Sequence, residues 1–219
     1  MTTLIFVRHG EAEGNVEKVF HGWHNSDLTK NGRLQAERTA EYLQDVAIDV
    51  LYASDLKRTM ETAGYIARKK HLEIHPDSRL REIFGGDWEN KPWADLPETY
   101  PEAYENWLKY PHKLIMPGGE SMQDFQKRLV EAVEDIAKQN EGKQICIVIH
   151  GTALKALLCW FRRLPLSEFP KQKWCDNAAV TIVEADQGNY TVKVDGYKDH
   201  LGELSTLDKQ TWWRGETEE

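Results

Sequence analysis

Two segments of the sequence change from apolar to polar at a histidine that is followed by a glycine. Residues 4–10 read LIFVRHG, and residues 145–151 read ICIVIHG. Arg8 precedes the first histidine, His9, and its guanidinium offers a planar fork of hydrogen-bond donors that suits anionic oxygens. His9 and His150 add imidazoles, whose charge changes near neutral pH. Side chains of these types, brought to one place, would act on an anionic group.

A third segment adds a second arginine. Residues 49–54, DVLYAS, form another apolar run, and Arg58 lies in the first turn of the helix expected after it, within SDLKRTMETA. Ligands of open α/β sheets bind beyond the carboxyl ends of the strands. If the three runs are neighbouring strands, two histidines and two arginines converge on one point. Such a group needs an anion to offset its mutual repulsion.

Each of these residues, taken alone, has a simpler explanation. A histidine at a strand end is more often a hydrogen-bonded structural residue, and a single arginine is usually a surface charge. Two His-Gly strand exits in one chain, with an arginine at a third exit, favour a functional site. Gly10 and Gly151 would permit a sharp exit and a close approach of the backbone to a ligand.

The elements that must position these side chains alternate between strands and helices. Short apolar runs predict strands over residues 4–7, 49–54 and 144–150, with a short strand at 71–76. Thr29 can cap a helix that runs to about Gln44, with Leu34, Ala40 and Leu43 on one side. Further helices are predicted over residues 55–69, 121–140 and 152–161.

Two more segments complete the predicted fold. Residues 179–196 indicate two strands joined by a Gln-Gly-Asn turn, and residues 84–119 indicate a loop, a short helix and a loop. The order of elements predicts an α/β fold, a three-layer α/β/α sandwich whose mostly parallel central sheet has an antiparallel edge strand. We expect residues 1–219 to form a single domain, with residues 84–119 as a cap insertion over one end of the sheet.

Five motifs occur in order between residue 4 and about residue 160, namely VRHGEAEGN, SDLKRTMETA, LREIFGGDWEN, PGGES and IVIHGTALKALL. Together they resemble the histidine phosphatase superfamily, also called the phosphoglycerate mutase-like family. The first motif is specific, because Arg-His-Gly-Glu is followed by Asn15 six residues after His9. The resemblance implies the α/β sandwich and a reaction at a phosphoryl group.

The resemblance also implies roles for the converging residues. His9 would be the nucleophile, since a neutral imidazole can attack phosphorus and form a phosphohistidine. Arg8 and Arg58 would disfavour the protonated form of His9 and bind the phosphoryl oxygens. His150 would donate a hydrogen bond to the same oxygens, and the backbone of Gly151 would add another.

Glu82, in LREIFGG, occupies the position of the family's general acid, which protonates the leaving alkoxide. A carboxyl group can act as an acid near neutral pH only if burial or the bound phosphate raises its pKa. Arg81 would act in the opposite direction unless its side chain points away. The alternative is that Glu82 is a surface residue in a charged loop.

Asn15, His21 and Gly22 match positions that line the phosphate site in relatives. His21 is a departure, since glutamine or threonine is more usual there, and a histidine would make the contact sensitive to pH. A metal pair at His21 and His24 is an alternative, but no carboxylate or cysteine partner has suitable spacing. We therefore expect no metal and no other cofactor.

Phosphatases and mutases of this family share the same core. Cofactor-dependent mutases carry a Glu-Arg-His-Tyr element at the acid position and a longer insertion after it, whereas this chain has LREIFGGDWEN and only about 35 residues before PGGES. That resembles the phosphatase branch, especially bacterial broad-specificity phosphatases. The prediction is metal-independent hydrolysis of small phosphomonoesters. A cofactor-dependent phosphoglycerate mutase, an α-ribazole phosphatase and a non-catalytic binder of phosphorylated ligands are the alternatives.

Trp88, Trp93, Trp107 and Tyr104 lie in the insertion. They suggest an aromatic wall over the site that would favour esters with apolar or aromatic leaving groups. The alternative is that they form the core of the cap.

Composition limits the partners. The chain has 219 residues, a net charge of −8 and a pI of about 5.5, which argues against nucleic acid. Its apolar runs are far shorter than a membrane span needs, and no signal-peptide pattern is evident. Its three cysteines are too sparse for a disulfide framework. We expect a cytoplasmic protein, a monomer or a homodimer, whose partner is a small-molecule phosphate ester and whose last, charged residues are mobile.

Overall fold

The computed structural model describes residues 1–209, which are built around a six-stranded sheet of order β3-β2-β4-β1-β5-β6. The strands are β1 (Thr2–Arg8), β2 (Val50–Ala53), β3 (Ile74–Pro76), β4 (Gln144–Ile149), β5 (Val180–Asp186) and β6 (Asn189–Tyr197). The strands β3, β2, β4 and β1 pair in parallel, whereas β5 runs antiparallel to β1 and to β6. The mostly parallel sheet is therefore confirmed, and its antiparallel part is the predicted hairpin.

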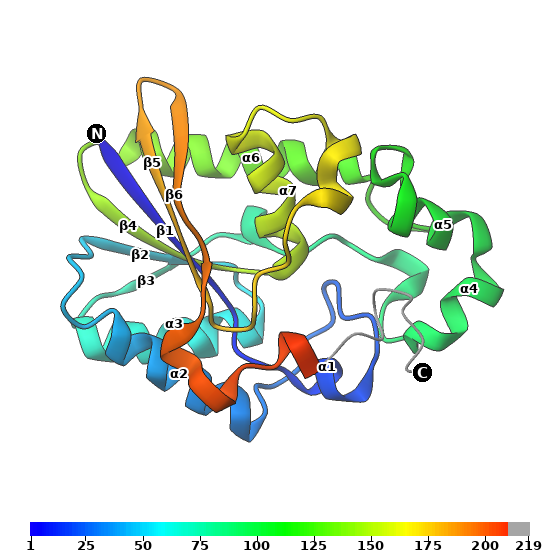
Figure 1. Cartoon of the computed structure of the whole chain (residues 1–219), viewed down its shortest axis with the longest axis horizontal. Coiled ribbons are helices and arrows are strands. Elements are labelled where there is room, and N and C mark those ends of the chain that lie inside the picture. Colours follow the sequence, from blue (N-terminus) through cyan, green and yellow to red (C-terminus); the bar gives the residue numbers. More distant parts are fainter. Residues whose placement is uncertain (210–219) are drawn as a thin grey trace.

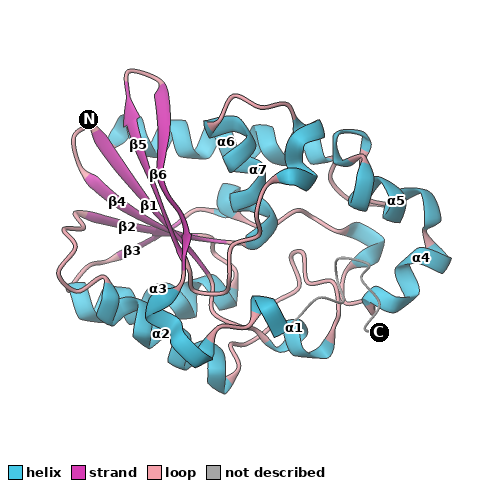
Figure 2. Ribbon diagram, viewed as in Figure 1, coloured by secondary structure: helices cyan, strands magenta, loops and turns pink. Residues whose placement is uncertain are grey.

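Helices cover both faces of the sheet, which confirms the three layers. The helices α2 (Lys30–Tyr42) and α3 (Lys57–Lys70) lie on one face, and α6 (Met122–Gln139) and α7 (Gly151–Phe161) lie on the other (Figure 1). Figure 2 shows that the short helices α1 (Glu13–Glu17), α4 (Leu96–Thr99) and α5 (Pro101–Lys109) lie away from these layers, toward the end of the sheet where β1 and β4 finish.

The strand β1 illustrates why the central strands are continuously apolar. Leu4 and Phe6 belong to the core cluster that includes residues of α6 and α7, whereas Ile5 and Val7 belong to the cluster on the α2 and α3 side. All four side chains are at most 1% exposed. Successive residues of a strand point to opposite faces, so a strand covered on both faces needs an unbroken apolar run.

Local sequence signals set the helix boundaries as predicted. The Thr29 side chain accepts a hydrogen bond from the backbone N–H of Gly32, and the Ser121 side chain accepts one from Asp124, so each residue caps its helix. The apolar positions predicted for α6 are all buried, namely Met122, Phe125, Leu129, Val133 and Ile136.

The predicted inward face of α2 is wrong in one position. Leu34 is 42% exposed, whereas its neighbour Gln35 is fully buried. Gln35 is satisfied there because its side chain accepts a hydrogen bond from the backbone N–H of Glu11 and donates one to the carbonyl oxygen of Leu204. A buried polar residue with both partners can take an inward position that apolar periodicity assigns elsewhere.

Residues 84–119 form the predicted cap of loops and short helices. That residues 1–219 make a single domain stays a prediction, and the expectation of a mobile C-terminal end falls on residues 210–219, outside those described. Within residues 1–209 no helix is both long and apolar enough to cross a membrane. Cys146, Cys159 and Cys175 are buried thiols without a disulfide bond.

Candidate active site

The sheet order brings the carboxyl ends of the three predicted strands together. The strand β4 lies between β2 and β1, and all three are parallel, so their carboxyl ends share one edge of the sheet. That edge carries Arg8 and His9 after β1, His150 after β4 and Arg58 in the first turn of α3. The rings of His9 and His150 meet with their centroids 5.3 Å apart and their planes at 61°.

His9 is held as a neutral imidazole with a defined tautomer. Its Nδ1 lies 2.7 Å from the carbonyl oxygen of Gly10, so Nδ1 carries the proton and Nε2 keeps a lone pair. Burial, with the charges of Arg58 and Arg8, lowers the pKa of His9 well below its ordinary value, and the Gly10 carbonyl only partly opposes this. The ring is 4% exposed. His9 therefore carries a neutral imidazole with a free Nε2 lone pair at neutral pH.

The two arginines are held by backbone carbonyls. The Arg8 guanidinium donates to the carbonyl oxygen of Cys175 at 2.6 Å, and that of Arg58 donates to Gly22 at 2.8 Å and to His24 at 2.9 Å. Burial lowers the pKa of Arg58 to about 10 and also lowers that of Arg8. Arginine starts from so high a pKa that both groups stay charged at neutral pH.

His150 is buried beside His9 and is not among the residues that line the cavity described below. Its ring is fully buried, and its Nε2 lies 2.8 Å from the hydroxyl of Ser54. Within the described part of the chain its Nδ1 has no hydrogen-bond partner. Burial and the charge of Arg58 lower the pKa of His150 well below its ordinary value. A direct hydrogen bond from His150 to a phosphoryl oxygen stays a prediction.

Glu82 is a buried carboxyl group, not a surface residue of a charged loop. It is 8% exposed, and its two oxygens accept hydrogen bonds of 3.0 Å from the backbone N–H groups of Ile83 and Thr152. Burial raises the pKa of Glu82, and those two hydrogen bonds and the charge of Arg58 oppose the rise. Arg81 points away, since its guanidinium makes two hydrogen bonds of 2.6 Å to Asp55.

These side chains surround a small cavity of about 90 Å³. It is lined by the predicted residues Arg8, His9, Asn15, His21, Gly22, Arg58, Glu82 and Gly151, and also by Val19, Phe20, Trp93, Trp107, Thr152, Trp174 and Leu207. A larger groove of about 610 Å³ adjoins it and shares the walls Trp107, Trp174 and Leu207. The cavity has room for a phosphoryl group, and the groove has room for what is attached to it.

The aromatic residues of the cap were predicted to form either a wall over the site or the core of the cap, and the structure shows both. Trp93 and Trp107 line the cavity. Trp88 is fully buried and packs edge-to-face against Phe20, and Tyr104 packs against the same core cluster. Trp93 and Trp107 also pack in this cluster, so they belong to the core of the cap and to the cavity wall at once, and Trp174, far along the chain, adds a third tryptophan to the wall.

His21 does not make the site sensitive to pH near neutrality, so that expectation is wrong. Burial, with the charge of Arg58, lowers the pKa of His21 to about 3. The ring fits because Gly14 has no side chain, since a Cβ there would lie 1.9 Å from the Nε2 of His21. The neighbouring Asn15 is fixed by its Oδ1, which accepts a hydrogen bond of 2.9 Å from the backbone N–H of Ala12.

The two glycines after the histidines serve packing within the protein. A Cβ on Gly10 would lie 2.4 Å from the carbonyl oxygen of Gly32, so the close approach is between the end of β1 and α2. A Cβ on Gly151 would lie 3.1 Å from the Nε of Arg8. Gly10 is thus required by a neighbouring helix and not by a ligand, and Gly151 makes room for a guanidinium.

Several wall residues were not predicted from the sequence. Thr152 follows directly after the His-Gly motif of β4, so its position was readable from the pattern. Trp174 comes from a loop and Leu207 from a short 3-10 helix (Leu207–Lys209), and neither segment carries a periodic signal. No group of three histidine, cysteine, aspartate or glutamate side chains that could hold a metal ion occurs in residues 1–209.

The fold and this cavity define an α/β enzyme that places a neutral imidazole, two guanidinium groups and a buried carboxyl group around a site for an oxyanion. Comparison with protein families gives the same class, since the family "Histidine phosphatase superfamily (branch 1)" matches residues 4–196. The chain belongs to this superfamily. It is a phosphatase of the superfamily, a phosphoric monoester hydrolase.

Individual relatives cover nearly the whole chain. Phosphoserine phosphatase 1 of Hydrogenobacter thermophilus is 33% identical over 207 residues, which are 93% of this chain and 96% of that protein. Phosphoglycerate mutase-like protein 4 of Arabidopsis thaliana is 32% identical over 207 residues, covering 93% and 89% of the two chains. The solved structure of Bacillus stearothermophilus YhfR superposes with a TM-score of 0.89 at 37% identity, covering 92% of this chain and 100% of that chain.

Proposed function

We propose that the protein hydrolyses small phosphomonoesters through a phosphohistidine formed on His9, without a metal ion. The observation that carries this proposal is the state of His9, a neutral imidazole with Nδ1 bonded to the Gly10 carbonyl, in a cavity that two guanidinium groups also line. A fixed tautomer leaves Nε2 as the nucleophile, and no proton has to be removed before attack.

In the first step Nε2 of His9 attacks the phosphorus of the ester, and the bond from phosphorus to the ester oxygen breaks. Arg8 and Arg58 bind the phosphoryl oxygens and offset their charge as it spreads in the transition state. Glu82 gives its proton to the departing oxygen. The products of this step are an alcohol, a phosphohistidine and an ionised Glu82.

In the second step a water molecule attacks the phosphorus, and the bond to Nε2 of His9 breaks. The Glu82 carboxylate takes a proton from that water, so inorganic phosphate forms and Glu82 returns to its acid form. Burial supports this role, because it raises the pKa of Glu82 toward the range in which a carboxyl group can act as an acid. Two arginines supply the positive charge that a metal ion would otherwise provide.

The cavity volumes support substrates with a small phosphoryl end and a leaving group that extends outward. About 90 Å³ is too little for a whole metabolite, so the leaving group passes between Trp107, Trp174 and Leu207 into the groove. The aromatic walls favour apolar or aromatic leaving groups. The relative named phosphoserine phosphatase supports a small phosphorylated metabolite as the physiological substrate class.

The test is hydrolysis of para-nitrophenyl phosphate by the wild type and His9→Ala, with a chelator present. We expect activity in the wild type, loss of at least three orders of magnitude in His9→Ala, and an acid-labile phosphoryl adduct on the wild type only. Asp135→Asn is the control, because Asp135 is an exposed partner of Arg79 remote from the cavity lining. An inactive wild type, or a fully active His9→Ala, would refute the mechanism.

Mutase activity beside hydrolysis is the second candidate, because the Arabidopsis relative carries a mutase-like name. The protein is incubated with 3-phosphoglycerate and a bisphosphoglycerate primer, and 2-phosphoglycerate and inorganic phosphate are both measured. Release of phosphate in excess supports a phosphatase, whereas faster formation of 2-phosphoglycerate supports a mutase. A panel that includes phosphoserine, α-ribazole phosphate, aryl phosphates and glycerol phosphate then ranks the substrates, and equal rates on aryl and glycerol esters would contradict an apolar selector.

A further inference from the structure

The two arginines of the cavity are positioned in the same indirect way. Neither guanidinium makes an ion pair with a carboxylate of the described residues within 4 Å; each donates to backbone carbonyls of a loop. Arg8 donates to residue 175, and Arg58 donates to residues 22 and 24. A guanidinium paired directly with a carboxylate would have part of its charge and donors taken before a phosphoryl group arrived.

The carboxylate of Glu89 binds backbone N–H groups of the loop that holds Arg58. Glu89 accepts three backbone N–H groups, from Trp23 at 2.9 Å, from His24 at 2.8 Å and from Gly85 at 2.8 Å. Gly22 leaves space for this carboxylate, since a Cβ there would lie 1.9 Å from Oε1 of Glu89. These hydrogen bonds fix residues 22–24. The carbonyl oxygens of residues 22 and 24 in turn accept hydrogen bonds from the guanidinium of Arg58.

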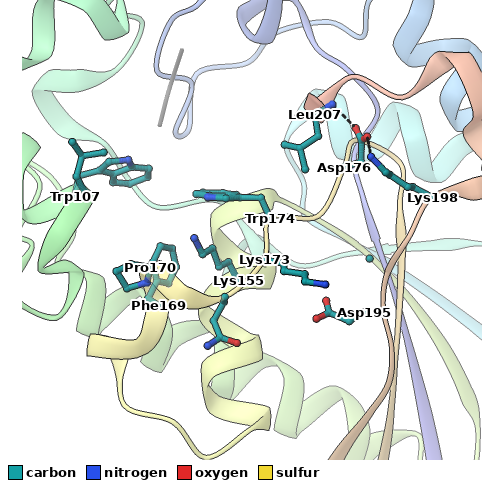
Figure 3. Close-up of a pocket in the computed structure, with 13 residues that line it drawn as sticks. Trp107, Lys155, Phe169, Pro170, Lys173, Trp174, Asp176, Asp195, Lys198 and Leu207 are labelled. Carbon is teal, nitrogen blue, oxygen red and sulfur yellow. Dashed lines mark hydrogen bonds and ion pairs between the residues drawn. The ribbon is translucent and has the colours of Figure 1, made fainter. Parts of the chain in front are cut away.

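The carboxylate of Asp176 binds backbone N–H groups of the loop that holds Arg8. Asp176 is 1% exposed, and its Oδ1 accepts the backbone N–H groups of Asn177 at 2.8 Å, Thr206 at 3.2 Å and Leu207 at 3.1 Å. The hydroxyl of Thr206 donates to the same oxygen at 3.1 Å. Figure 3 shows Asp176 joined to Leu207 and to Lys198, at the side of the groove opposite Trp107.

The loop around Asp176 is also tied to the nucleophile. The carbonyl oxygen of the preceding residue, Cys175, accepts a hydrogen bond from Arg8. The side chain of Asn177 donates a hydrogen bond of 3.1 Å to the carbonyl oxygen of His9. The backbone N–H of Ala178 donates to the carbonyl oxygen of Arg8 at 3.0 Å. Asp176 therefore connects the segment around Leu207, a wall of the cavity, with the segment that carries Arg8 and His9.

We propose that Glu89 and Asp176 are positioning residues for Arg58 and Arg8, respectively. Each carboxylate fixes a loop by hydrogen bonds, and backbone carbonyls of that loop hold the arginine. The carboxylates lie one loop away from the guanidinium groups, so they fix the arginines without occupying the donors that bind phosphate.

This inference rests on the proposed role of the two arginines in binding the phosphoryl group. Its test is a double-mutant cycle, because a residue that acts only through Arg58 has nothing left to act on when Arg58 is absent. The variants Glu89→Gln, Arg58→Ala and their combination are compared by kcat/KM for para-nitrophenyl phosphate. In the Glu89→Gln variant the amide nitrogen cannot accept an N–H, so at least one of the three bonds is lost.

We expect Glu89→Gln to lower kcat/KM about tenfold in the wild type and less than about twofold in Arg58→Ala, since misplacing a charge by a fraction of an ångström has effects of this size. In an Arg8→Ala background the tenfold loss should persist. A purely structural role would lower activity by the same factor in all backgrounds. Equal losses with and without Arg58 would therefore overturn the inference for Glu89.

Asp176 offers a matched pair of substitutions. Asp176→Asn keeps an oxygen at the position of Oδ1 with its four donors, whereas Asp176→Ala removes the acceptor altogether. We expect kcat/KM to stay within about twofold for the amide and to fall about tenfold for the alanine, with the loss confined to backgrounds that contain Arg8. Should Asp176→Ala not fold, Ser205→Ala with Thr206→Val removes two side-chain donors to Asp176 and serves the same comparison.

The arginine variants separate the proposed function from the positioning role of the two carboxylates. Full activity of Arg8→Ala and Arg58→Ala would refute the proposed function itself. Impaired arginine variants with additive effects of the carboxylate substitutions would refute only the positioning role. Asp135→Asn, an exposed carboxylate paired with Arg79, is the control for loss of negative charge and should leave kcat/KM unchanged.

Discussion

The carboxyl group of Glu82 accepts a hydrogen bond of 3.0 Å from the backbone N–H of Thr152, the second residue of α7. This contact joins the segment just before the cap to a helix N-terminus, next to Gly151 in the wall of the cavity. The positive end of the helix favours the ionised carboxyl group, whereas burial favours the neutral one. Burial is the larger effect and raises the pKa of Glu82.

A first prediction concerns the leaving group. Glu82→Gln keeps the shape of the side chain but cannot donate an acidic proton, so kcat/KM for an alkyl phosphate, which reports the step that forms the phosphohistidine, should fall about 10²-fold to 10⁴-fold. Para-nitrophenolate leaves without protonation, so kcat/KM for that ester should fall much less. The ratio of the two losses, measured with steady-state kinetics, reports the acid role. Equal losses for both esters would show that Glu82 acts on binding or folding instead.

A second prediction concerns the pH dependence of kcat/KM. His9 must be neutral, and its pKa lies well below 6.5, so activity should not fall as the pH decreases from 7.5 through 6.5. Glu82 must be protonated for the first step, and its pKa is raised above 4.5, so activity should fall as the pH rises through that raised value. We expect an optimum on the acidic side of neutrality.

The variant Glu82→Gln provides the control for this profile, because it should lose the alkaline limb while it keeps the acidic limb. An acidic limb at or above pH 6.5 in the wild type would show that His9 has an ordinary pKa and would contradict the electrostatic account of the site.

A third prediction concerns stability. The pKa of His21 is about 3 in the folded protein and 6.5 in the unfolded chain, so below pH 6.5 only the unfolded chain binds this proton. The stability that depends on a neutral His21 is present above pH 6.5 and is lost as the pH falls. Between pH 7.5 and pH 5 the loss amounts to about 2 kcal/mol for this residue.

Chemical denaturation of the wild type and His21→Gln at both pH values measures this loss. The difference in unfolding free energy between the two pH values should be about 2 kcal/mol smaller in His21→Gln. His75→Gln, at an exposed position of β3, should leave the difference unchanged. An unaltered pH dependence in His21→Gln would mean that the buried imidazole is protonated in the folded protein.

A fourth prediction concerns the glycine after the nucleophile. Gly10→Ala places a Cβ 2.4 Å from the carbonyl oxygen of Gly32, which is backbone and cannot rotate away. We expect a loss of about 1–3 kcal/mol in unfolding free energy as β1 and α2 are forced apart. Gly64→Ala is the control, because its nearest neighbour is the end of Arg68 at 3.5 Å and α3 should gain up to about 1 kcal/mol. Equal effects of the two substitutions would contradict the packing argument.

The strand exits were predictable because burial on both faces demands an apolar run, and a run that ends in Arg-His-Gly is visible without a structure. The same holds for Thr29 and Ser121, whose capping depends on the next three residues. Leu34 shows the limit of this reasoning. Its exposure follows from the hydrogen bonds of Gln35 to Glu11 and Leu204, and Leu204 lies 169 residues away from Gln35 in the chain.

The environment of the reacting groups depended on the tertiary structure. Motifs identify Glu82 and His21, but the direction of each pKa shift depends on burial and on which charges lie nearby. The side chain of Arg81 turns to Asp55 and away from Glu82, which no local pattern encodes.

Apolar periodicity and short motifs are local properties, so they were enough to identify the residues proposed for the chemistry and the strand ends that present them. How Arg8 and Arg58 are held depends on the fold, since Asp176 and Glu89 bind loops that are distant in sequence from these arginines and adjacent to them in space. The contact between Arg8 and Cys175 spans 167 residues. Hydrogen-bond partners and burial arise when the chain folds, and they set the direction in which the pKa values of His9 and Glu82 shift.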